Sequence, residues 1–492
     1  MTRDSQDSAQ ASVGGPAQVD SVVVLGAGVA GLAAAIRLRE HGVAHVAVLE
    51  RAERPGGLAV TLQFEGHSSD LGPHRLYTEI PEVKRFYKET AGPSMYEVER
   101  RSRMFLAGRF LAYPPAIGEL LRAFGPRRLA RFGFSWAWTR LADLGAGMAK
   151  WTCEGYLRNA FGKALYEDLV GPYARKVFKT DPLRLDTEAA RVRVSAGSLA
   201  RMARRFIGSK GRDDSAALLT RFHYLKGGAE TLVRHMADKA RSLGVEIHLQ
   251  HEAQRFEMEG QRPVAVGASA AGGERVFRAD RFISTIPLPD LAEILDRAAS
   301  LHPRTLEAAR SLRFLNMIVV LVVVNRKTVS RDQWIYFPEP RFVFNRVSEP
   351  KAFDPGMGPP ERSALCCEIT CRPDVDLWPE TDEAIAERVV AGLVQSGLVG
   401  RGEVCAVHVH RLHNAYPLYD LNYGQRLHAA LAGLAQFENV LTAGRQGLFN
   451  YNNMDHSIFM GFRAADRAVF SKRPAQAWLG ELERFRGFRI VD

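Results

Sequence analysis

"SVVVLGAGVAGLAAAIRLREHGVAHVAVLE", residues 21–50, decides the fold of this 492-residue chain. The β-branched run 22–25 is typical of a buried parallel strand, and a glycine turn follows it at once. Gly26 permits the tight turn, Gly28 lets the backbone approach a pyrophosphate, and Gly31 lets the next helix pack on the strand. The free N–H groups and the dipole of that helix favour negative charge. The pattern therefore predicts dinucleotide binding.

The residues after the turn indicate which dinucleotide is bound. A second strand, residues 46–49, ends in Glu50, where a carboxylate can receive ribose hydroxyls. Gly56 and Gly57 follow and let the chain pass close to a ligand. This continuation resembles the FAD-binding pattern of glutathione-reductase-like flavoproteins, in particular the amine oxidase branch. A second glycine motif behind a strand is missing, so we expect NAD(P)H only as a transient reductant.

Composition and charge exclude several other classes of protein. The net charge is +11, from 66 Lys and Arg against 55 Asp and Glu, but the excess is spread along the chain. We interpret it as a compositional bias, with no nucleic-acid partner. The five cysteines lack paired spacing, which fits a reducing compartment and neither a disulfide framework nor a metal site. We expect the cysteine-bearing run 364–371 to be a buried strand.

Targeting and membrane segments are not expected either. The first 20 residues are polar and lack the apolar core of a signal peptide. The longest apolar run, residues 315–324, is too short for a membrane helix of ~20 residues and predicts a buried strand. The sequence therefore predicts a soluble, cytoplasmic protein without an integral membrane segment.

The predicted fold class is α/β, with a discontinuous Rossmann-like FAD-binding domain that carries inserts. Later strand, turn and helix patterns complete the first motif. The expected organisation is a disordered lead at 1–20, an FAD-binding domain at 21–80, 223–295 and 405–470, a mainly helical insert at 81–222, an α+β substrate domain at 296–404, and a C-terminal tail at 471–492.

Several blocks resemble one branch of this superfamily. "DLGPHRLYTEIPEVKRFYKE" (70–89) is similar to the flavin-side loop of UDP-galactopyranose mutases. "GRFLAYP" (108–114) and the block 161–194 are similar to the mutase segments that follow. "NAYPLYD" (414–420) and "GRQGLFNYNNMDHSI" (444–458) resemble its Tyr-Pro segment and its final FAD-binding segment. The order of these blocks agrees over residues 20–470.

The resemblance implies a mutase acting on an anionic nucleotide sugar. In that family N5 of the reduced flavin attacks the anomeric carbon and displaces the nucleotide diphosphate, and the sugar recloses with a different ring size without net redox change. It implies catalytic or substrate roles for His74, Arg193 (with Arg191 as the fallback), Tyr416, Tyr419 and Arg346. Tyr416 and Tyr419 either both line the sugar pocket or one of them belongs to the core. Trp334 and Tyr336 either face substrate or belong to the core. It implies cofactor contacts by Gly26, Gly28, Gly31, Glu50, Arg51, Gly56, Gly57, Leu58, Gly72, Pro73, His74, Ala253, Thr285, Gly444, Arg445, Asn453, Met454, Asp455 and Ile458.

The chain departs from the mutase pattern at the diphosphate. A second diphosphate-binding arginine is replaced within Phe314-Leu315-Asn316, unless Arg313 or Arg346 substitutes for it. Phe449 and Asn452 stand where the mutases carry tyrosines. An unpaired buried phosphate charge would cost ~2–5 kcal/mol. These losses favour a different nucleotide sugar or a different substrate altogether.

Two alternatives to a mutase remain open. The first is an oxidase or desaturase of the same superfamily, acting on an amine, a porphyrinogen or an isoprenoid. Its substrate C–H bond would lie against the flavin and give up a hydride, and dioxygen would reoxidise the flavin. The second is a flavin-binding structural or sensor protein. The turns at 225–228 and 284–287 occur throughout the superfamily and do not discriminate.

Overall fold

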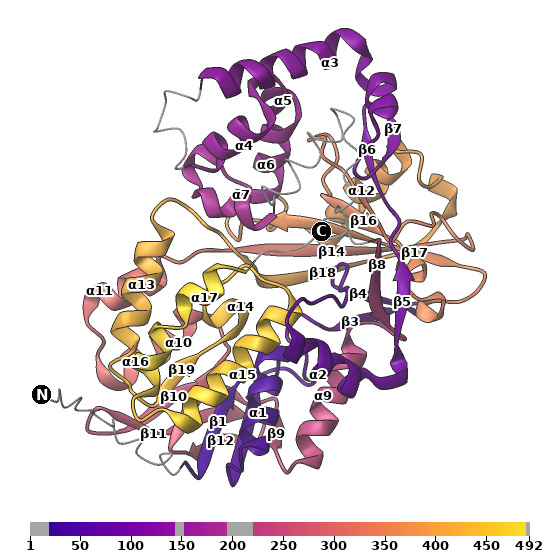
Figure 1. Cartoon of the computed structure of the whole chain (residues 1–492). Coiled ribbons are helices and arrows are strands. Elements are labelled where there is room, and N and C mark those ends of the chain that lie inside the picture. Colours follow the sequence, from indigo (N-terminus) through magenta and orange to yellow (C-terminus); the bar gives the residue numbers. More distant parts are fainter. Residues whose placement is uncertain (1–18, 143–151, 194–219, 489–492) are drawn as a thin grey trace, which may run out of the picture.

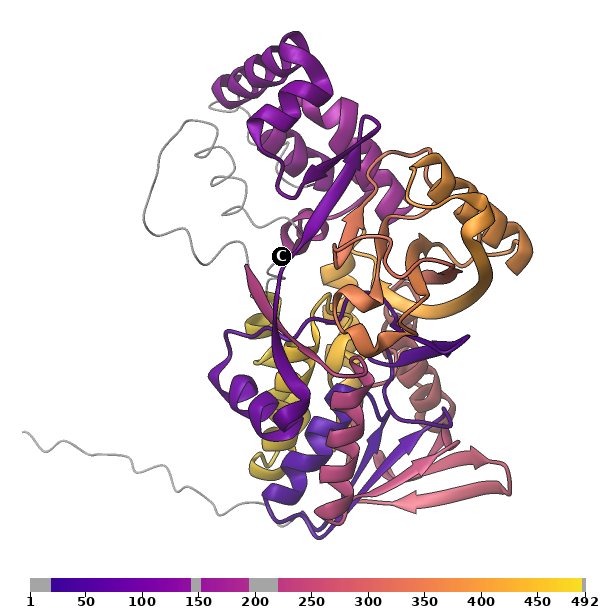
Figure 2. The same ribbon diagram turned by 90° about the vertical axis from the view of Figure 1, so that its right-hand side faces the viewer.

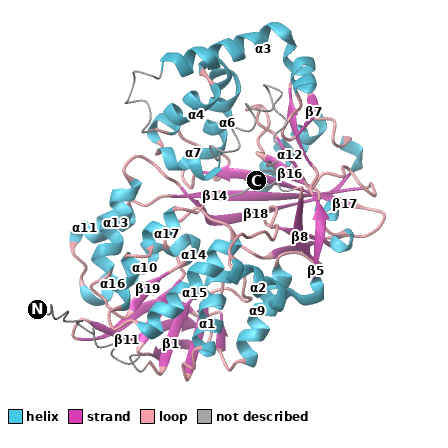
Figure 3. Cartoon of the chain, viewed as in Figure 1, coloured by secondary structure: helices cyan, strands magenta, loops and turns pink. Residues whose placement is uncertain are grey.

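A computed structural model describes residues 19–142, 152–193 and 220–488. Figure 1 shows a dinucleotide-binding part at the bottom, a large sheet in the middle and a helical lobe at the top. Figure 3 shows the same division by secondary structure, with strands concentrated below the helical lobe. Within the described ranges, no helix combines the length and the apolar character that crossing a membrane requires.

The lower part is built on a five-stranded parallel sheet. Its strand order is β19-β13-β1-β2-β9 (Val440–Thr442, Arg281–Ser284, Ser21–Leu25, His45–Glu50 and Glu246–Leu249). Strands far apart in the sequence therefore meet beside the glycine turn, with Val24 opposite Val48 on one side and Ile283 on the other. The predicted α/β class with a discontinuous Rossmann-like domain is confirmed.

Helices cover one face of this sheet and an antiparallel sheet lies on the other side. The helices are α1 (Val29–Glu40), α2 (Pro81–Ala91), α9 (Glu230–Ser242) and α15 (Met454–Phe470). The antiparallel strands are β10 (Glu252–Glu259), β11 (Arg262–Ala270) and β12 (Gly273–Arg278). Figure 2 shows them on the side of the parallel sheet that faces away from α1. α1 is buried nearly all round because α15 packs closely on it. A Cβ added at Gly461 would lie 2.2 Å from the Ala30 carbonyl oxygen.

The middle part is a seven-stranded sheet with the order β18-β14-β17-β16-β15-β6-β7. Its strands are Val404–Pro417, Phe314–Val324, Ser363–Cys371, Arg346–Ser348, Trp334–Tyr336, Ser102–Leu106 and Arg109–Ala112. β14 and β17 are buried along their whole length, as expected from the two apolar runs. β18 pairs with β14, so this sheet extends into residues that the sequence assigned to the FAD-binding domain. Alternating polarity identifies a strand but not the sheet that it joins.

Smaller elements connect the two sheets. They are the hairpin β3–β4 (Thr61–Phe64, His67–Asp70), the pair β5–β8 (Met95–Glu99, Arg221–Leu225), and the helices α10 (Leu288–Ala299), α11 (Pro303–Arg310), α12 (Asp382–Gln395), α13 (Tyr423–Leu434) and α14 (Gly444–Gly447). Residues 474–486 also form helices, α16 (Pro474–Leu479) and α17 (Leu482–Arg486). Trp478 donates a 2.8 Å hydrogen bond to the Thr442 carbonyl, so this part of the predicted tail is packed on the sheet. Residues 1–18 of the predicted lead lie outside the described residues.

The helical lobe comes from the first predicted insert. It contains α3 (Ile117–Ala142), α4 (Cys153–Phe161), α5 (Lys163–Leu165), a π-helical turn (Tyr166–Val170), α6 (Gly171–Phe178) and α7 (Thr187–Arg193). α3 is broken at Gly125, whose φ of +74° is left-handed, and Pro126 begins the second half where a missing N–H does no harm. Figure 1 shows α3 at the outer edge of the molecule.

Candidate active site

The glycine turn forms one wall of a cavity of about 1040 Å³. Gly28 caps α1 in an extended conformation without a side chain, so the first-turn N–H groups of the helix face an open cradle. The Gly56 N–H donates a 3.0 Å bond to the Ala27 carbonyl, which brings the second glycine pair alongside. A Cβ added at Gly57 would lie 3.4 Å from the Gly28 Cα and narrow the cradle. This arrangement fits the pyrophosphate of FAD.

Glu50 is fixed at the end of β2 beside the turn. Its two carboxylate oxygens accept hydrogen bonds from the Ala27 N–H at 2.8 Å and from the Ala52 N–H at 2.9 Å. The carboxylate is therefore held where a ribose can reach it. Arg51 points elsewhere: it is exposed and lies 3.8 Å from Glu252.

The other predicted cofactor residues divide into two groups. Those that line the cavity are Leu58, Gly72, Pro73, His74, Thr285, Gly444, Arg445, Asn453 and Met454. Ala253 lies in β10, while Asp455 and Ile458 are buried in α15, and none of these three lines the cavity. Gly31 acts through packing, because a Cβ there would lie 1.9 Å from the Gly26 carbonyl oxygen.

The loop carrying Gly72 rests on a buried ion pair. Arg346 donates two hydrogen bonds of 2.7 Å to the two carboxylate oxygens of Glu368, directly across β16 and β17. Gly72 has a φ of +96°, and a Cβ added there would lie 2.8 Å from a Glu368 carboxylate oxygen. The loop can approach this pair only because residue 72 is a glycine. Arg346 lines the cavity, but its charge is already neutralised.

His74 is a neutral imidazole at the cavity wall. Its Nδ1 lies 2.9 Å from the Gly72 carbonyl oxygen, which can only accept a hydrogen bond. The proton is therefore assigned to Nδ1, and Nε2 remains an acceptor. Burial lowers the pKa of His74, and this effect exceeds the opposing influence of the Asp70 carboxylate.

Asp70 was not predicted, yet it organises the approach to this loop. Its Oδ1 accepts hydrogen bonds from the Thr61 hydroxyl at 2.7 Å and from the Ala229 N–H at 2.9 Å. Its Oδ2 accepts one from the Tyr224 hydroxyl at 2.6 Å. Asp70 is 5% exposed and joins β4 to β8 and to the start of α9. The sequence offered one signal for this role, namely the position of Asp70 directly before the Gly72 loop.

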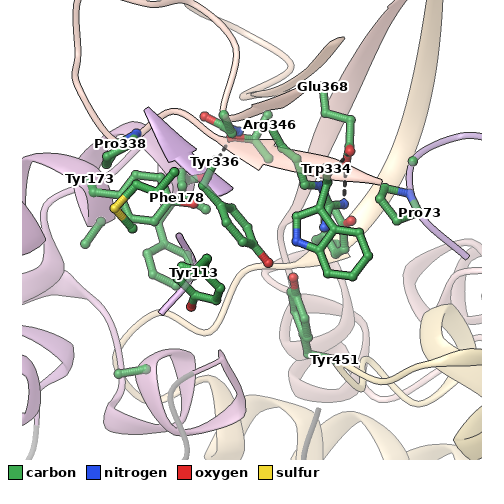
Figure 4. Close-up of a pocket in the computed structure, with 18 of the residues that line it drawn as sticks. Pro73, Tyr113, Tyr173, Phe178, Trp334, Tyr336, Pro338, Arg346, Glu368 and Tyr451 are labelled. Atoms are coloured by element: carbon green, nitrogen blue, oxygen red, sulfur yellow. Dashed lines mark hydrogen bonds and ion pairs between the residues drawn. The ribbon is translucent and has the colours of Figure 1, made fainter. Parts of the chain in front are cut away.

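Aromatic side chains fill the middle of the cavity. We call Tyr113, Trp334, Tyr336, Tyr416 and Tyr451 the aromatic cluster. Tyr416 and Tyr451 stack with ring centroids 5.1 Å apart, and Tyr113 lies 4.7 Å from Tyr336. Figure 4 shows Tyr336 and Tyr451 pointing toward one another, between the Gly72 loop on one side and the lobe residues on the other. Tyr416, Trp334 and Tyr336 thus line the cavity.

Two predicted substrate positions lie elsewhere. The prediction for Tyr419 is corrected: this side chain is 6% exposed, stacks on Tyr423 at 4.1 Å and accepts a 2.7 Å bond from the Tyr451 N–H. It belongs to the core, because the strand end that exposes Tyr416 turns Tyr419 inward. Arg191 is exposed and pairs with Glu188 at 3.1 Å. The side chain of Arg193 lies outside the described residues.

The cavity continues as an apolar arm into the helical lobe. Its lining there consists of Ile117, Leu120, Leu121, Phe124, Pro126, Leu129, Ala130, Phe132, Gly133, Trp136, Leu157, Ala160, Phe161, Leu165, Leu169, Val170, Tyr173, Ala174, Val177, Phe178, Ala189 and Ala190. We call this set the apolar arm. Every member is apolar or aromatic, and none carries a charge. The charged residues of the described lining (Arg75, Arg346, Glu368 and Arg445) all lie near the Gly72 loop. Sequence patterns did not reveal this arm, because its side chains look like core residues.

A family model for flavin-containing amine oxidoreductases matches residues 29–469. The chain belongs to this family. It is accordingly a flavin-dependent enzyme, an oxidoreductase or an isomerase, and the cradle described above fits the cofactor.

Individual relatives differ in chemistry. The chain is 26% identical over 425 residues to the 4,4'-diapolycopene oxygenase of Methylomonas sp., covering 77% of this chain and 81% of that one. It is 52% identical over 52 residues to a zeta-carotene-forming phytoene desaturase of Myxococcus xanthus, covering 11% and 10%. Its fold is similar to a crystal structure of reduced UDP-galactopyranose mutase, with a TM-score of 0.78, 20% identity, and coverage of 95% and 100%.

Proposed function

We propose that this chain is an FAD-dependent oxidoreductase that desaturates a long, apolar, isoprenoid-type substrate. The observation that carries the proposal is the apolar arm, whose described lining carries no charged side chain between the aromatic cluster and the helical lobe. A hydrocarbon chain gains about 0.8 kcal/mol for each methylene transferred from water into such a lining. The names of two relatives, a diapolycopene oxygenase and a phytoene desaturase, point to polyene substrates.

The charges near the Gly72 loop support the same proposal. Both arginines that could replace the missing diphosphate ligand are engaged: Arg346 pairs with Glu368, and Arg313 lies 2.8 Å from Asp420. Arg445 donates to the main-chain carbonyls of Ala415 and Asn452. A diphosphate held by these three arginines would have to break the contacts, which is costly in a buried site. An apolar substrate leaves them intact.

The chain's own residues then account for the chemistry. When bound, FAD supplies the acceptor for a hydride from a substrate carbon, and dioxygen restores its oxidised form. The apolar arm holds the substrate chain and excludes water. The aromatic cluster fixes the reacting carbons by packing against their flat, unsaturated segment. Nε2 of His74 accepts the proton lost from the neighbouring carbon, and a carbon–carbon double bond forms between the two.

A nucleotide-sugar mutase is the second candidate. The position of α7 at the edge of the cavity favours it. Ala189 and Ala190 of this helix line the cavity, so the helix that carries Arg191 and Arg193 borders the site. An arginine there can hold a diphosphate that enters from the lobe side.

Anaerobic reduction of the flavin separates the two candidates. Purified FAD-loaded protein is mixed under argon with phytoene in detergent micelles, and the flavin absorbance is followed. We expect bleaching by phytoene, recovery in air, and a product lighter by two hydrogen atoms. In parallel, dithionite-reduced protein receives UDP-galactose. A mass-neutral isomer of the sugar nucleotide, without bleaching by phytoene, would overturn the proposal in favour of the mutase.

A further inference from the structure

Helix α3 presents apolar side chains on two opposite faces. Its inner face contributes Leu129, Phe132 and Trp136 to the apolar arm. Its outer face carries Phe134, Trp138 and Leu141, which are 74%, 65% and 66% exposed. Their spacing of i, i+4 and i+7 places them on one stripe of the helix. The apolar residues of the inner face are accounted for because they line the cavity. The apolar residues of the outer stripe are not covered by any part of the described chain.

Positive charge continues the same stripe. Arg127 and Arg131 precede Phe134 at helical spacing on that side of the second half of α3. After Glu119, α3 contains no acidic residue. Asp168 from the lobe offsets part of this charge, since it lies 3.0 Å from Arg128 and 3.4 Å from Arg131. Large exposed apolar side chains bordered by arginines are the pattern of a helix that lies in the headgroup region of an anionic membrane.

The first half of α3 brings the lining of the apolar arm to the surface of the lobe. Ile117 and Leu121, in the first half of α3, line the apolar arm and are also 43% and 42% exposed. Figures 1 and 2 show α3 at the tip of the lobe, away from the dinucleotide-binding part. A flat surface in contact with α3 would therefore meet the helical lobe and not the dinucleotide-binding part.

We propose that the outer face of α3, formed by Arg127, Arg131, Phe134, Trp138 and Leu141, docks this protein peripherally on the surface of an anionic lipid bilayer. The docked helix lies in the plane of the headgroups, with its apolar stripe below them and its arginines against lipid phosphates. Ile117 and Leu121 then open the apolar arm toward the acyl chains. This inference goes beyond the proposed function, because docking does not depend on which molecule is oxidised.

Vesicle binding tests the proposal directly. Full-length FAD-loaded protein is sedimented with vesicles of phosphatidylcholine alone, or with about one third of the lipid replaced by phosphatidylglycerol. We expect binding to the anionic vesicles that weakens with salt, and a blue shift of tryptophan emission that disappears in Trp138→Phe. Failure to bind anionic vesicles at low salt would overturn docking while leaving the proposed chemistry untouched.

Three sets of variants locate the contact. The triple change Phe134→Ser, Trp138→Ser and Leu141→Ser should weaken binding roughly 100-fold, because each side chain loses partial burial in the acyl boundary. The pair Arg127→Gln and Arg131→Gln should weaken it roughly 25-fold on anionic vesicles. The matched control is Val276→Ser with Val375→Ser, two residues outside α3 that are 45% and 40% exposed. Its binding should be unchanged.

The readouts also exclude other causes. Bound FAD, measured by its visible spectrum, must be retained in every variant, because none of the changed residues lines the cavity. Equal loss of vesicle binding in the control and in the triple variant would refute the claim that the outer face of α3 makes the contact. If light scattering instead shows a dimer that only the triple variant dissolves, and vesicles do not compete with it, the stripe is a self-association surface and the proposal fails.

Discussion

Breaking the ion pair between Arg346 and Glu368 tests how the Gly72 loop is supported. Glu368→Gln preserves the shape of the side chain but removes its charge. The guanidinium of Arg346, whose side chain is 24% exposed, then keeps its charge without a counterion. Removing one member of a buried pair typically costs about 3–5 kcal/mol, because the remaining charge stays desolvated. We expect a loss of unfolding free energy in this range.

The loss can be read from the thermal midpoint of the FAD-loaded protein. At about 2 °C for each kcal/mol in a large domain, Tm should fall by about 6–10 °C, followed by the flavin fluorescence released on unfolding. The double change Arg346→Met and Glu368→Gln should recover most of this shift, since no unpaired charge is left. A change of the same kind at an exposed pair, Asp374→Asn beside Arg372, should cost at most about 1 kcal/mol.

The comparison of these variants decides the question. If Glu368→Gln lowers Tm no more than Asp374→Asn, the carboxylate does not neutralise Arg346 in the folded protein. If the double variant is no more stable than Glu368→Gln, the cost does not come from the stranded guanidinium. Either result would refute the reasoning about the loop and its support.

Three further predictions concern the cavity. Gly72→Ala should reduce FAD retention at least tenfold in dialysis, because its Cβ would lie 2.8 Å from a Glu368 oxygen at a positive φ; normal retention would contradict the close approach. The rate of anaerobic flavin reduction by phytoene should fall as pH decreases, because protonation removes the hydrogen-bond acceptor at Nε2 of His74. The midpoint of this fall should lie below the ordinary histidine pKa of 6.5, because burial lowers the pKa of His74. The variant His74→Ala should be slow at every pH and should show no such titration. Leu129→Glu should abolish phytoene turnover while keeping FAD, because it buries a charge in the apolar arm, whereas Val375→Glu, at an exposed site, should retain full turnover; equal activities would contradict an apolar binding path.

Local signals in the sequence predicted the dinucleotide-binding part well. The run 22–25, the glycine turn and Glu50 follow one another in the chain, so their chemistry and spacing can be recognised without knowledge of the distant strands that complete the sheet. The buried strands β14 and β17 were also predictable, since a strand covered on both faces must be apolar throughout.

The substrate side could not be predicted in the same way. The apolar arm assembles from α3, α4, α5, the π-helical turn, α6 and α7, and a side chain that lines a cavity has the same polarity as one that fills a core. Tyr416 and Tyr419 illustrate the problem, because they lie in one short segment yet only Tyr416 faces the cavity. The role of Asp70 depends on Tyr224 and Ala229, more than 150 residues away. The resemblance to mutases predicted the fold. The proposed substrate rests instead on the lining of the apolar arm.

The dependence of binding on substrate chain length shows whether the apolar arm holds a hydrocarbon chain. The apparent dissociation constant of each substrate is obtained from the concentration dependence of anaerobic flavin reduction, for a series of acyclic isoprenoids of increasing length. An apolar binding path in the arm predicts tighter binding by up to about fourfold for each added methylene, levelling off once the apolar arm is filled. Affinity that ignores chain length, together with tight binding of a nucleoside diphosphate, would contradict it.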